Sequence, residues 1–344
     1  MQKTVVLLLS VVFFLPIAKA QKKIFPKLEV IHTGLKTSLR GLSVVNDNVV
    51  WVSGNNGMVG KTTNGGKNWK WITVKGFEKA DFRDIEAFDA KTAIIMAIAD
   101  PAYILKTTDG GDSWKLVYEN KTKGMFLDAM EFCDLMNGIV IGDPVDGIFF
   151  LAKTVDGGSS WIEVPAEQRP RADSGEACFA SSGTNIRFLY NRTIVFVSGG
   201  LNSRLFYNYM PADLPITKGF ETTGANSVAV WDNYKKSAGK NIVVVGGDFT
   251  KDSSSFKNCY YSNDGGKNWQ QPKRPPNGYR SCVEFLNKDQ LVTCGLNGVD
   301  YSIDGGRNWK AISSEGFHVC RFARFGNSVY LAGNNGKIGK LAWQ

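Results

Sequence analysis

The octapeptide Thr62-Thr63-Asn64-Gly65-Gly66-Lys67-Asn68-Trp69 recurs four more times in this chain of 344 residues. The other copies are TTDGGDSW at 107–114, TVDGGSSW at 154–161, SNDGGKNW at 262–269 and SIDGGRNW at 302–309. Two adjacent glycines supply positive φ angles at little steric cost, and an Asp or Asn side chain accepts hydrogen bonds from nearby backbone N–H groups. Each copy therefore predicts a tight turn between two strands, with its Trp packed beneath the turn as an apolar peg.

We expect the polar side chains of these boxes to cap turns, and neither to catalyse a reaction nor to bind metal. The capping residues are Asn64, Asp109, Asp156, Asp264 and Asp304. The pegs are Trp69, Trp114, Trp161, Trp269 and Trp309.

The spacing of the boxes predicts the architecture. The capping positions are separated by 45, 47, 108 and 40 residues, so one repeat without a box lies in the long interval. Each period carries several short runs of β-branched and aromatic residues, as a four-stranded propeller blade requires. We predict an all-β, seven-bladed β-propeller with blades at 39–74, 82–118, 126–164, 176–215, 225–272, 279–312 and 317–343.

The last repeat stops before its outer strand. Residues 27–31, KLEVI, resemble the strand that follows the box at Trp309. We expect this N-terminal strand of the mature chain to close the ring, because closure removes free sheet edges.

The first twenty residues predict export. Met1 to Ala20 has a basic start at Lys3, an apolar run from Val5 to Pro16 and a small-x-small end at Ala18-Lys19-Ala20, as signal peptides do. We expect cleavage before Gln21, no membrane span, and one secreted or periplasmic domain over 21–344. The net charge of +9 comes without Lys/Arg runs interleaved with aromatics, which argues against nucleic acid.

The five boxes, the seven repeats and the export signal together resemble the Asp-box (BNR) propellers of the photosystem II assembly-factor type. The segment SGEACFASSGT at 174–184 is also similar to a non-photosynthetic bacterial branch of that family. The resemblance implies a non-catalytic scaffold that holds a client membrane protein or a cofactor–protein intermediate. The Asp box also occurs in sialidases, reelin and sortilin-type receptors, so it specifies the fold better than the function.

A polar site is expected on the face where the inner strands begin, because the loops joining the second and third strands lie on that face too. The starts of the inner strands carry Arg40, Arg83, Asp84, Asp128, Glu176, Asn226, Arg280 and His318. The loops between second and third strands add Asn55, Asp100, Asp143, Asp248, Asn297 and Asn334.

Such a ring suits a polar or anionic ligand, a glycan included, or a protein partner. The alternative is a polar, wet channel in which each Arg pairs with a neighbouring carboxylate, Arg83 with Asp84 being the simplest pair. His318 is expected to be a hydrogen-bonded channel residue rather than a general base. We expect a monomeric binding or assembly scaffold without catalytic residues, cofactor or metal.

Two enzymatic alternatives stay open. A sialidase-like glycoside hydrolase would use Arg40, Arg83 and Arg280 as clamps and Glu176 or Asp128 as carboxylates. The Arg-Ile-Pro signature of sialidases is missing from the sequence, and sialidases have six blades. An oxidoreductase would need a cofactor site, yet the sequence has neither a dinucleotide fingerprint nor a haem motif.

Six cysteines lie at 133, 178, 259, 282, 294 and 320, with no CxxC spacing. Cys282 and Cys294 flank a short turn between two predicted strands. If Leu286 faces Leu291, the two sulfurs come nearly opposite, which predicts a cross-strand disulfide. Cys178 and Cys320 fall at the position equivalent to Cys282 in their own blades, and we expect them to be small buried packing residues.

Overall fold

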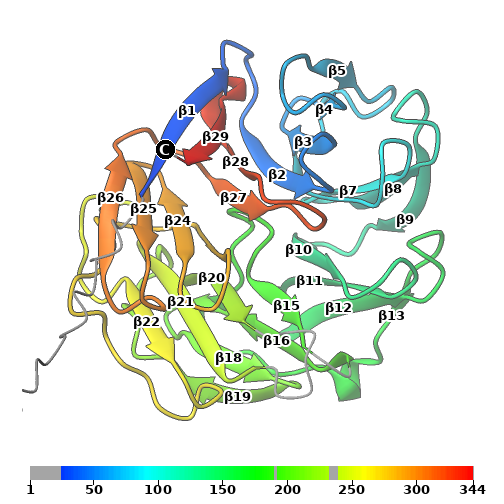
Figure 1. Cartoon of the computed structure of the whole chain (residues 1–344). Helices are drawn as coiled ribbons and strands as arrows, with labels where there is room; N and C mark the ends of the chain where they lie inside the picture. Colours follow the sequence, from blue (N-terminus) through cyan, green and yellow to red (C-terminus); the bar gives the residue numbers. More distant parts are fainter. Residues whose placement is uncertain (1–24, 190–191, 232–238, 344) are drawn as a thin grey trace, which may run out of the picture.

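Short antiparallel sheets follow one another around a common axis (Figure 1). This computed structural model describes residues 25–189, 192–231 and 239–343. Within those ranges the chain forms seven sheets, and the predicted all-β, seven-bladed propeller is confirmed. The predicted signal peptide, Met1 to Ala20, lies outside the described residues. In these three ranges, no helix has the length and apolar character needed to cross a bilayer.

The first three blades each have four strands in simple succession. Blade one contains β2 (Leu39–Val44), β3 (Val50–Gly54), β4 (Met58–Thr62) and β5 (Lys70–Thr73). Blade two contains β6 (Phe82–Ala87), β7 (Ala93–Ala97), β8 (Ala102–Thr107) and β9 (Lys115–Asn120). Blade three contains β10 (Leu127–Phe132), β11 (Gly138–Val145), β12 (Ile148–Thr154) and β13 (Ile162–Glu163), and the 3-10 turn η1 (Ala166–Gln168) follows.

Blades four and five share an irregular junction. Blade four contains β15 (Ile186–Phe188), β16 (Ile194–Val197), β18 (Arg204–Tyr207) and β19 (Met210–Asp213). Blade five contains β20 (Thr223–Trp231), β21 (Asn241–Asp248) and β22 (Cys259–Ser262). Two short strands, β14 (Glu176–Ala177) and β17 (Gly199–Gly200), extend the sheet of blade five at β20.

The start predicted for blade four is therefore wrong. The prediction began its inner strand near Glu176, whereas the inner strand of this blade is β15, which begins at Ile186. Cys178 is consequently not equivalent to Cys282, which lies on an inner strand. The physical reason is that residues 178–185 leave the sheet and enter the central channel.

Blades six and seven complete the ring. Blade six contains β23 (Cys282–Phe285), β24 (Leu291–Gly295), β25 (Gly298–Ser302) and β26 (Trp309–Ser313). Blade seven contains β27 (Val319–Phe322), β28 (Val329–Ala332) and β29 (Ile338–Trp343), with the 3-10 turn η3 (Asn334–Gly336) between the last two. Its fourth strand is β1 (Pro26–His32), which pairs antiparallel with β29 from Pro26↔Trp343 to His32↔Ile338. In Figure 1 the blue β1 lies beside the red β29.

The Asp boxes make the hydrogen bonds that shape their turns. In the first box the Thr62 hydroxyl accepts the N–H of Gly66 at 3.1 Å, and the Asn64 side chain accepts the N–H of Asn68 at 3.0 Å. Gly65 and Gly66 have φ angles of 71° and 88°, which only glycine adopts freely. The other four boxes repeat both bonds.

The box tryptophans pack between blades. Trp161 and Trp309 are 8% and 5% exposed, and Trp69, Trp114 and Trp269 lie half-buried against apolar clusters. These clusters consist of side chains from the facing sheets of neighbouring blades, and the largest of them joins blades six, seven and one. The apolar area buried there holds the blades in a fixed ring and so positions the channel.

Candidate functional site

Residues 178–185 occupy the central channel, and we call this segment the channel plug. The Ser181 carbonyl accepts a hydrogen bond from Arg40 of blade one at 3.3 Å, and the Gly183 carbonyl accepts one from Arg321 of blade seven at 2.9 Å. Apart from Phe179, the segment carries short side chains, which allow it to fit between the inner strands. The plug separates an opening where the inner strands begin from an opening where they end.

The opening where the inner strands begin holds a cavity of about 400 Å³. Four of the predicted site residues, Arg40, Arg83, Asp143 and His318, line it. We call this cavity the arginine mouth. It is large enough for a side chain or a small ligand group.

The two arginines of the mouth differ in their partners. Arg83 donates through Nε to Asp81 at 2.8 Å, and both side chains are about one quarter exposed. The predicted pair of Arg83 with Asp84 is therefore wrong. Among the described residues, Arg40 has no carboxylate within ion-pair distance, and burial together with the Arg83 charge lowers its pKa. The half-buried Arg40 guanidinium thus has no ion-pair partner of its own among the described residues, which favours an anionic group beside it in the mouth.

His318 is neutral at physiological pH. Burial and the nearby Arg40 charge lower its pKa to about 4. Its Nε2 lies 2.9 Å from the Asn334 side-chain oxygen and 3.2 Å from the Ser38 hydroxyl. The imidazole therefore offers hydrogen bonds to the mouth but no charge.

Asp143 is the titratable carboxyl of the mouth. Burial raises its pKa to about 6, while a hydrogen bond from the Cys178 N–H at 2.9 Å works in the opposite direction. The charge of the mouth therefore changes in the pH range near neutrality.

An aromatic wall completes the mouth, and none of its residues was among the predicted site residues. Phe179 of the plug packs edge to face with Phe249 at 6.0 Å between ring centroids, and Phe249 packs in the same way with Tyr279 at 6.4 Å. Phe126 lies under the Arg83 guanidinium at 5.8 Å. Phe249 is 38% exposed although it is a large apolar side chain. Phe179, the aromatic residue inside the non-repeating segment 174–184, was the one feature of the sequence that could have indicated this wall.

Asp84 and Asp128 lie away from the mouth, in the packed interior. Asp84 is fully buried and accepts the N–H groups of Ile85 at 2.8 Å and Met130 at 2.7 Å. Burial raises its pKa to about 8, and the Arg321 charge opposes this. Asp128 is also fully buried, and burial together with Asp143 raises its pKa well above the usual value. Neither carboxyl reaches a ligand in the mouth.

Glu176 and Arg280 are held in buried ion pairs. Glu176 accepts hydrogen bonds from Arg204, whose Nε lies 2.9 Å away, and from the Ser198 hydroxyl. Arg280 is 1% exposed and donates through Nε to Asp300 at 2.7 Å. Both groups stabilise loops of the blades, so the structure does not bring them into the mouth as ligands.

The remaining predicted residues sit in loops of the rim. The Asn55 oxygen accepts the N–H of Ser38 at 2.8 Å, and Asp248 accepts the N–H of Thr250 at 3.0 Å. The pKa of Asp248 is lowered, because the hydrogen bonds from threonine outweigh the opposing effect of burial. Asp100 is exposed and lines a separate surface cavity beside Pro101.

The predicted amide side chains Asn226 and Asn297 hold residues around the mouth in position. The Asn226 oxygen accepts the Tyr279 hydroxyl at 2.7 Å and the Ser181 hydroxyl at 2.8 Å. The Asn297 oxygen accepts a bond from Arg280 at 2.7 Å. These bonds fix the tyrosine and the plug in their positions.

This arrangement does not assemble a glycosidase pair. Glu176 is bound by Arg204, and Asp128 is completely buried. A glycoside hydrolase needs two carboxyl groups that flank the substrate. Asp143 is the one predicted carboxyl that lines the mouth, so the described residues offer a binding surface there and not that catalytic pair.

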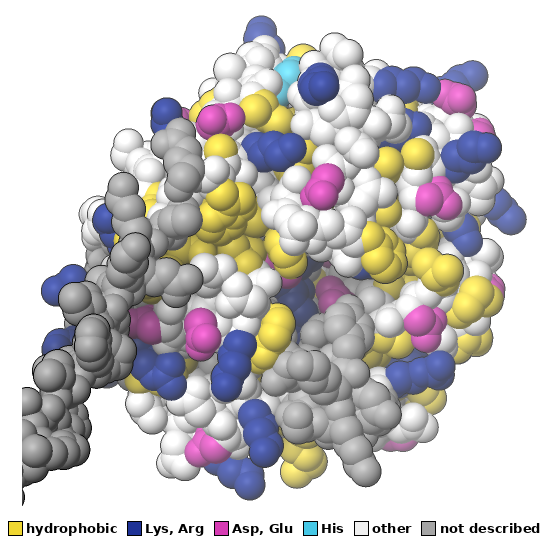
Figure 2. Space-filling view, in the orientation of Figure 1, with side chains coloured by type: hydrophobic (Ala, Val, Ile, Leu, Met, Phe, Trp, Pro, Cys, Tyr) yellow, Lys and Arg dark blue, Asp and Glu magenta, His cyan; other side chains and the backbone are white. Residues whose placement is uncertain are grey.

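The opposite opening, where the inner strands end, holds a cavity of about 340 Å³. Its lining includes six charged residues: Glu86, Glu131, Glu284, Arg187, Arg321 and Arg324. They pair with each other, as in Arg324–Glu86 at 2.8 Å and Arg187–Glu284 at 3.2 Å. Figure 2 looks onto this face, where basic and acidic side chains meet in the central hollow. Because these charges pair with one another, the channel arginine that has no ion-pair partner among the described residues, Arg40, lies on the other side of the plug.

All six cysteines are free thiols in the structure, so the predicted disulfide is not formed in it. Cys282 and Cys294 do lie directly opposite each other on β23 and β24. The register differs by one residue from the expectation, since Phe285 and not Leu286 faces Leu291. The Cys282 sulfur points to Cys320 of the next blade, 3.6 Å from its sulfur.

Comparisons with known proteins agree with the repeats. Residues 20–125 match the family model of the photosynthesis system II assembly factor YCF48, and residues 260–271 match the BNR/Asp-box repeat. A comparison with curated proteins gave no match.

Solved structures share the whole fold at low sequence identity. A structure of YCF48 bound to D1 peptide has a TM-score of 0.66 and 15% identity, over 92% of this chain and 97% of that chain. YCF48 from Cyanidioschyzon merolae has a TM-score of 0.66 and 16% identity, over 91% and 98%. The WD40 propeller domain of Doa1 has a TM-score of 0.60 and 12% identity, over 92% and 97%. The predicted resemblance is confirmed: this chain is a seven-bladed Asp-box propeller whose residues 20–125 are similar to the photosystem II assembly-factor family.

Proposed function

We propose that the protein is a non-catalytic scaffold that binds a segment of a partner protein through an anionic group held in the arginine mouth. The observation that carries this proposal is the Arg40 guanidinium, which lies half-buried near Arg83 at the mouth and has no carboxylate within ion-pair distance among the described residues. Aromatic side chains next to such a cation suit a peptide, because they bury apolar side chains of the partner while the arginines hold the charge.

The comparisons support a protein partner. The family model covers residues 20–125, which include both Arg40 and Arg83. A propeller of the same fold, YCF48, has been solved with a D1 peptide bound. Because identity to that structure is 15%, the peptide itself is not carried over to this chain.

Site-specific crosslinking would test the proposal. A photoreactive phenylalanine analogue replaces Phe249, which is exposed at the mouth, and the protein is illuminated with membranes of the source organism. We expect one dominant crosslinked protein, whose purified form then binds the unmodified scaffold. A charged hydrogen bond contributes about 1.5–3 kcal/mol, so Arg40→Met and Arg83→Met should each weaken binding about 10- to 100-fold.

Arg324→Met is the matched control, because Arg324 is a channel arginine at the opposite opening. It should bind like the unaltered protein. Equal loss in all three variants would contradict the arginine mouth as the binding site. Turnover of an aryl glycoside that Asp143→Asn abolishes would contradict the non-catalytic role.

We also propose that the chain is exported and cleaved before Gln21. The basic, apolar and small-residue segments of Met1 to Ala20 support this proposal. N-terminal sequencing of the protein from fractionated cells should give Gln21 as the first residue, in the periplasm or the medium. An intact Met1 in the cytoplasmic fraction would contradict it.

A further inference from the structure

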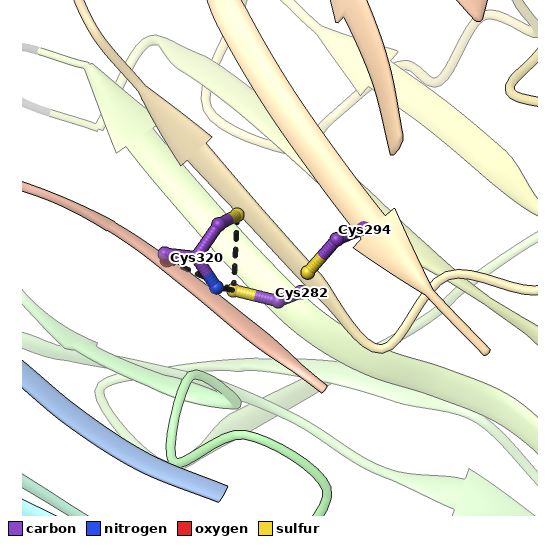
Figure 3. Close-up of side chains that lie close together, drawn as sticks. All are labelled: Cys282, Cys294 and Cys320. Atoms are coloured by element: carbon purple, nitrogen blue, oxygen red, sulfur yellow. Dashed lines mark hydrogen bonds between the residues drawn. The ribbon is translucent and has the colours of Figure 1, made fainter. Parts of the chain in front are cut away.

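Three thiols meet at the interface between blades six and seven. Cys282 lies on β23, Cys294 on β24 and Cys320 on β27, and each is 0% exposed. Their sulfur atoms all lie within 4.8 Å of one another. Figure 3 shows the three side chains converging from three different strands. We call this group the thiol triad.

We propose that the thiol triad is a site for a soft, three-coordinate metal ion, and specifically for Cu(I). This inference is independent of the proposed function, because the triad lies in the core and does not line the arginine mouth. Thiolate sulfur is a soft ligand that selects Cu(I), zinc or iron–sulfur clusters in proteins.

The spacing of the sulfurs suits a trigonal ion. Metal–thiolate bonds of about 2.3 Å in a planar trigonal site require sulfurs about 4.0 Å apart. The Cys282 and Cys320 sulfurs are 3.6 Å apart, and no pair in the triad exceeds 4.8 Å. Shifts of a few tenths of an ångström would therefore complete the site. A disulfide would require a far larger approach, since its S–S bond is about 2.05 Å.

The number of ligands separates Cu(I) from zinc. Structural zinc sites are almost always tetrahedral and have four protein ligands. In the part of the chain that the structure describes, no His, Asp, Glu or further Cys atom joins the triad. A three-thiolate site buried from water favours the ion that accepts three sulfurs.

Neighbouring groups are arranged to stabilise a negative sulfur. The Cys282 sulfur accepts the Cys320 N–H at 3.3 Å and the Thr184 hydroxyl at 3.6 Å. Arg321 adds a buried positive charge whose field favours the Cys282 thiolate. Hydrogen bonds to ligand sulfurs and nearby cations are the outer shell that metal–thiolate sites use. Without metal, the Cys282 thiol can donate to the Cys320 carbonyl at 3.2 Å.

An ion in the triad would join blade six to blade seven. Blade seven takes its outer strand β1 from the opposite end of the described chain, so this interface lies next to the junction of the two ends. The thiols lose their protons when they bind the metal. A metal ion that binds the folded state and not the unfolded chain stabilises the folded protein. The triad would thus act as a clamp on the ring.

The test uses the full protein, produced with copper in the medium and also titrated with Cu(I) under anaerobic, reducing conditions. We expect one copper per chain by mass spectrometry of the metal content. X-ray absorption of the copper should show three sulfur neighbours at about 2.3 Å. Melting temperature should rise on loading, in proportion to the logarithm of free Cu(I).

Cys282→Ser, Cys294→Ser and Cys320→Ser should each weaken Cu(I) binding by more than about 100-fold, beyond the effect of losing an outer-shell group. Cys259→Ser is the matched control, because Cys259 is equally buried but lies outside the triad. It should retain full binding. Circular dichroism checks that each variant is folded, and the absorption data on the unaltered protein do not depend on any variant.

Three outcomes would overturn the proposal. The first is less than a tenth of an equivalent of copper after both loading routes. The second is a two-sulfur shell that persists when one of the three cysteines is replaced. The third is a disulfide within the triad of the isolated protein, found by mass spectrometry of tryptic peptides without reductant. None of these outcomes concerns the arginine mouth, so the proposed function would stand or fall separately.

Discussion

Arg280 and Arg83 both lie where an inner strand begins, one repeat position apart, and the structure assigns them different energetic roles. Arg280 is 1% exposed and donates to Asp300 and Asn297 at 2.7 Å each and to two backbone carbonyls. The pair of Arg83 with Asp81 is about one quarter exposed on both sides. The same substitution to Met should therefore have very different effects on stability.

The size of the difference follows from burial. Arg280→Met leaves the Asp300 carboxylate, with 2% side-chain exposure, without its cation, which costs about 3–5 kcal/mol. Arg83→Met breaks a solvent-accessible pair, which costs about 0–1 kcal/mol. With about 2 °C per kcal/mol for a chain of this size, the melting temperature should fall by about 6–10 °C in the first variant and by less than about 2 °C in the second.

Urea denaturation followed by tryptophan fluorescence would measure the free energy of unfolding of both variants beside the unaltered protein, and thermal melting would measure the fall in melting temperature. A third variant, Arg280→Met with Asp300→Leu, removes both charges and should recover most of the loss, because no uncompensated charge is then buried. Similar losses of stability for Arg280→Met and Arg83→Met would refute the stabilising role assigned to the buried Arg280–Asp300 pair. So would a double variant that is no more stable than the single one.

Three further predictions concern the plug, the mouth and the boxes. Gly183→Ala places its Cβ 2.4 Å from the Asp84 carboxylate and should lower the free energy of unfolding by about 1–3 kcal/mol, as measured by thermal melting. Gly147→Ala is the control, because Gly147 has a φ of +74° and nothing within 4 Å of the added Cβ, and it should cost less. Asp143 loses its charge below its pKa of about 6, so the partner identified by crosslinking should bind more tightly at pH 5.5 than at pH 7.5, and Asp143→Asn should remove this dependence in calorimetry. Asp156→Ala loses two backbone hydrogen bonds and should cost about 1–2 kcal/mol in urea denaturation, while Asp156→Asn, the residue type used in the first box, should cost less.

The Asp boxes were predictable because all their defining contacts are local. The bond from the Asp156 carboxylate to the Ser160 N–H spans four residues, and Gly157 and Gly158 have positive φ within the same turn. Repetition of this unit at a period of forty-odd residues then determines the number of blades. For the same reason, the inner strands of six of the seven blades begin within three residues of the expected positions.

Blade four and the plug could not be predicted from spacing. No box fixes the register between Asp156 and Asp264, so nothing local distinguishes an inner strand at Glu176 from one at Ile186. The plug is held by contacts with Arg40 and Arg321, which are 141 and 138 residues distant from Ser181 and Gly183 respectively. Such contacts exist only once the ring has formed.

The site was predicted in part. Arg40, Arg83, Asp143 and His318 do line one cavity, since their positions in the repeat place them on one face. Arg280 does not line it, because the register places Ser281 at the position of Arg83 and Arg280 one residue earlier, where it pairs with Asp300 of β25.

The sequence by itself determined the turns, the repeat and therefore the ring, because hydrogen bonds within one octapeptide and an even spacing need no distant partner. Only the tertiary structure decided which charges remain free, where the plug lies and which thiols meet. Those properties depend on burial and on the distances between blades. Among the described residues, Arg40 lacks an ion-pair partner and Cys282 meets Cys320 only because seven sheets surround one axis.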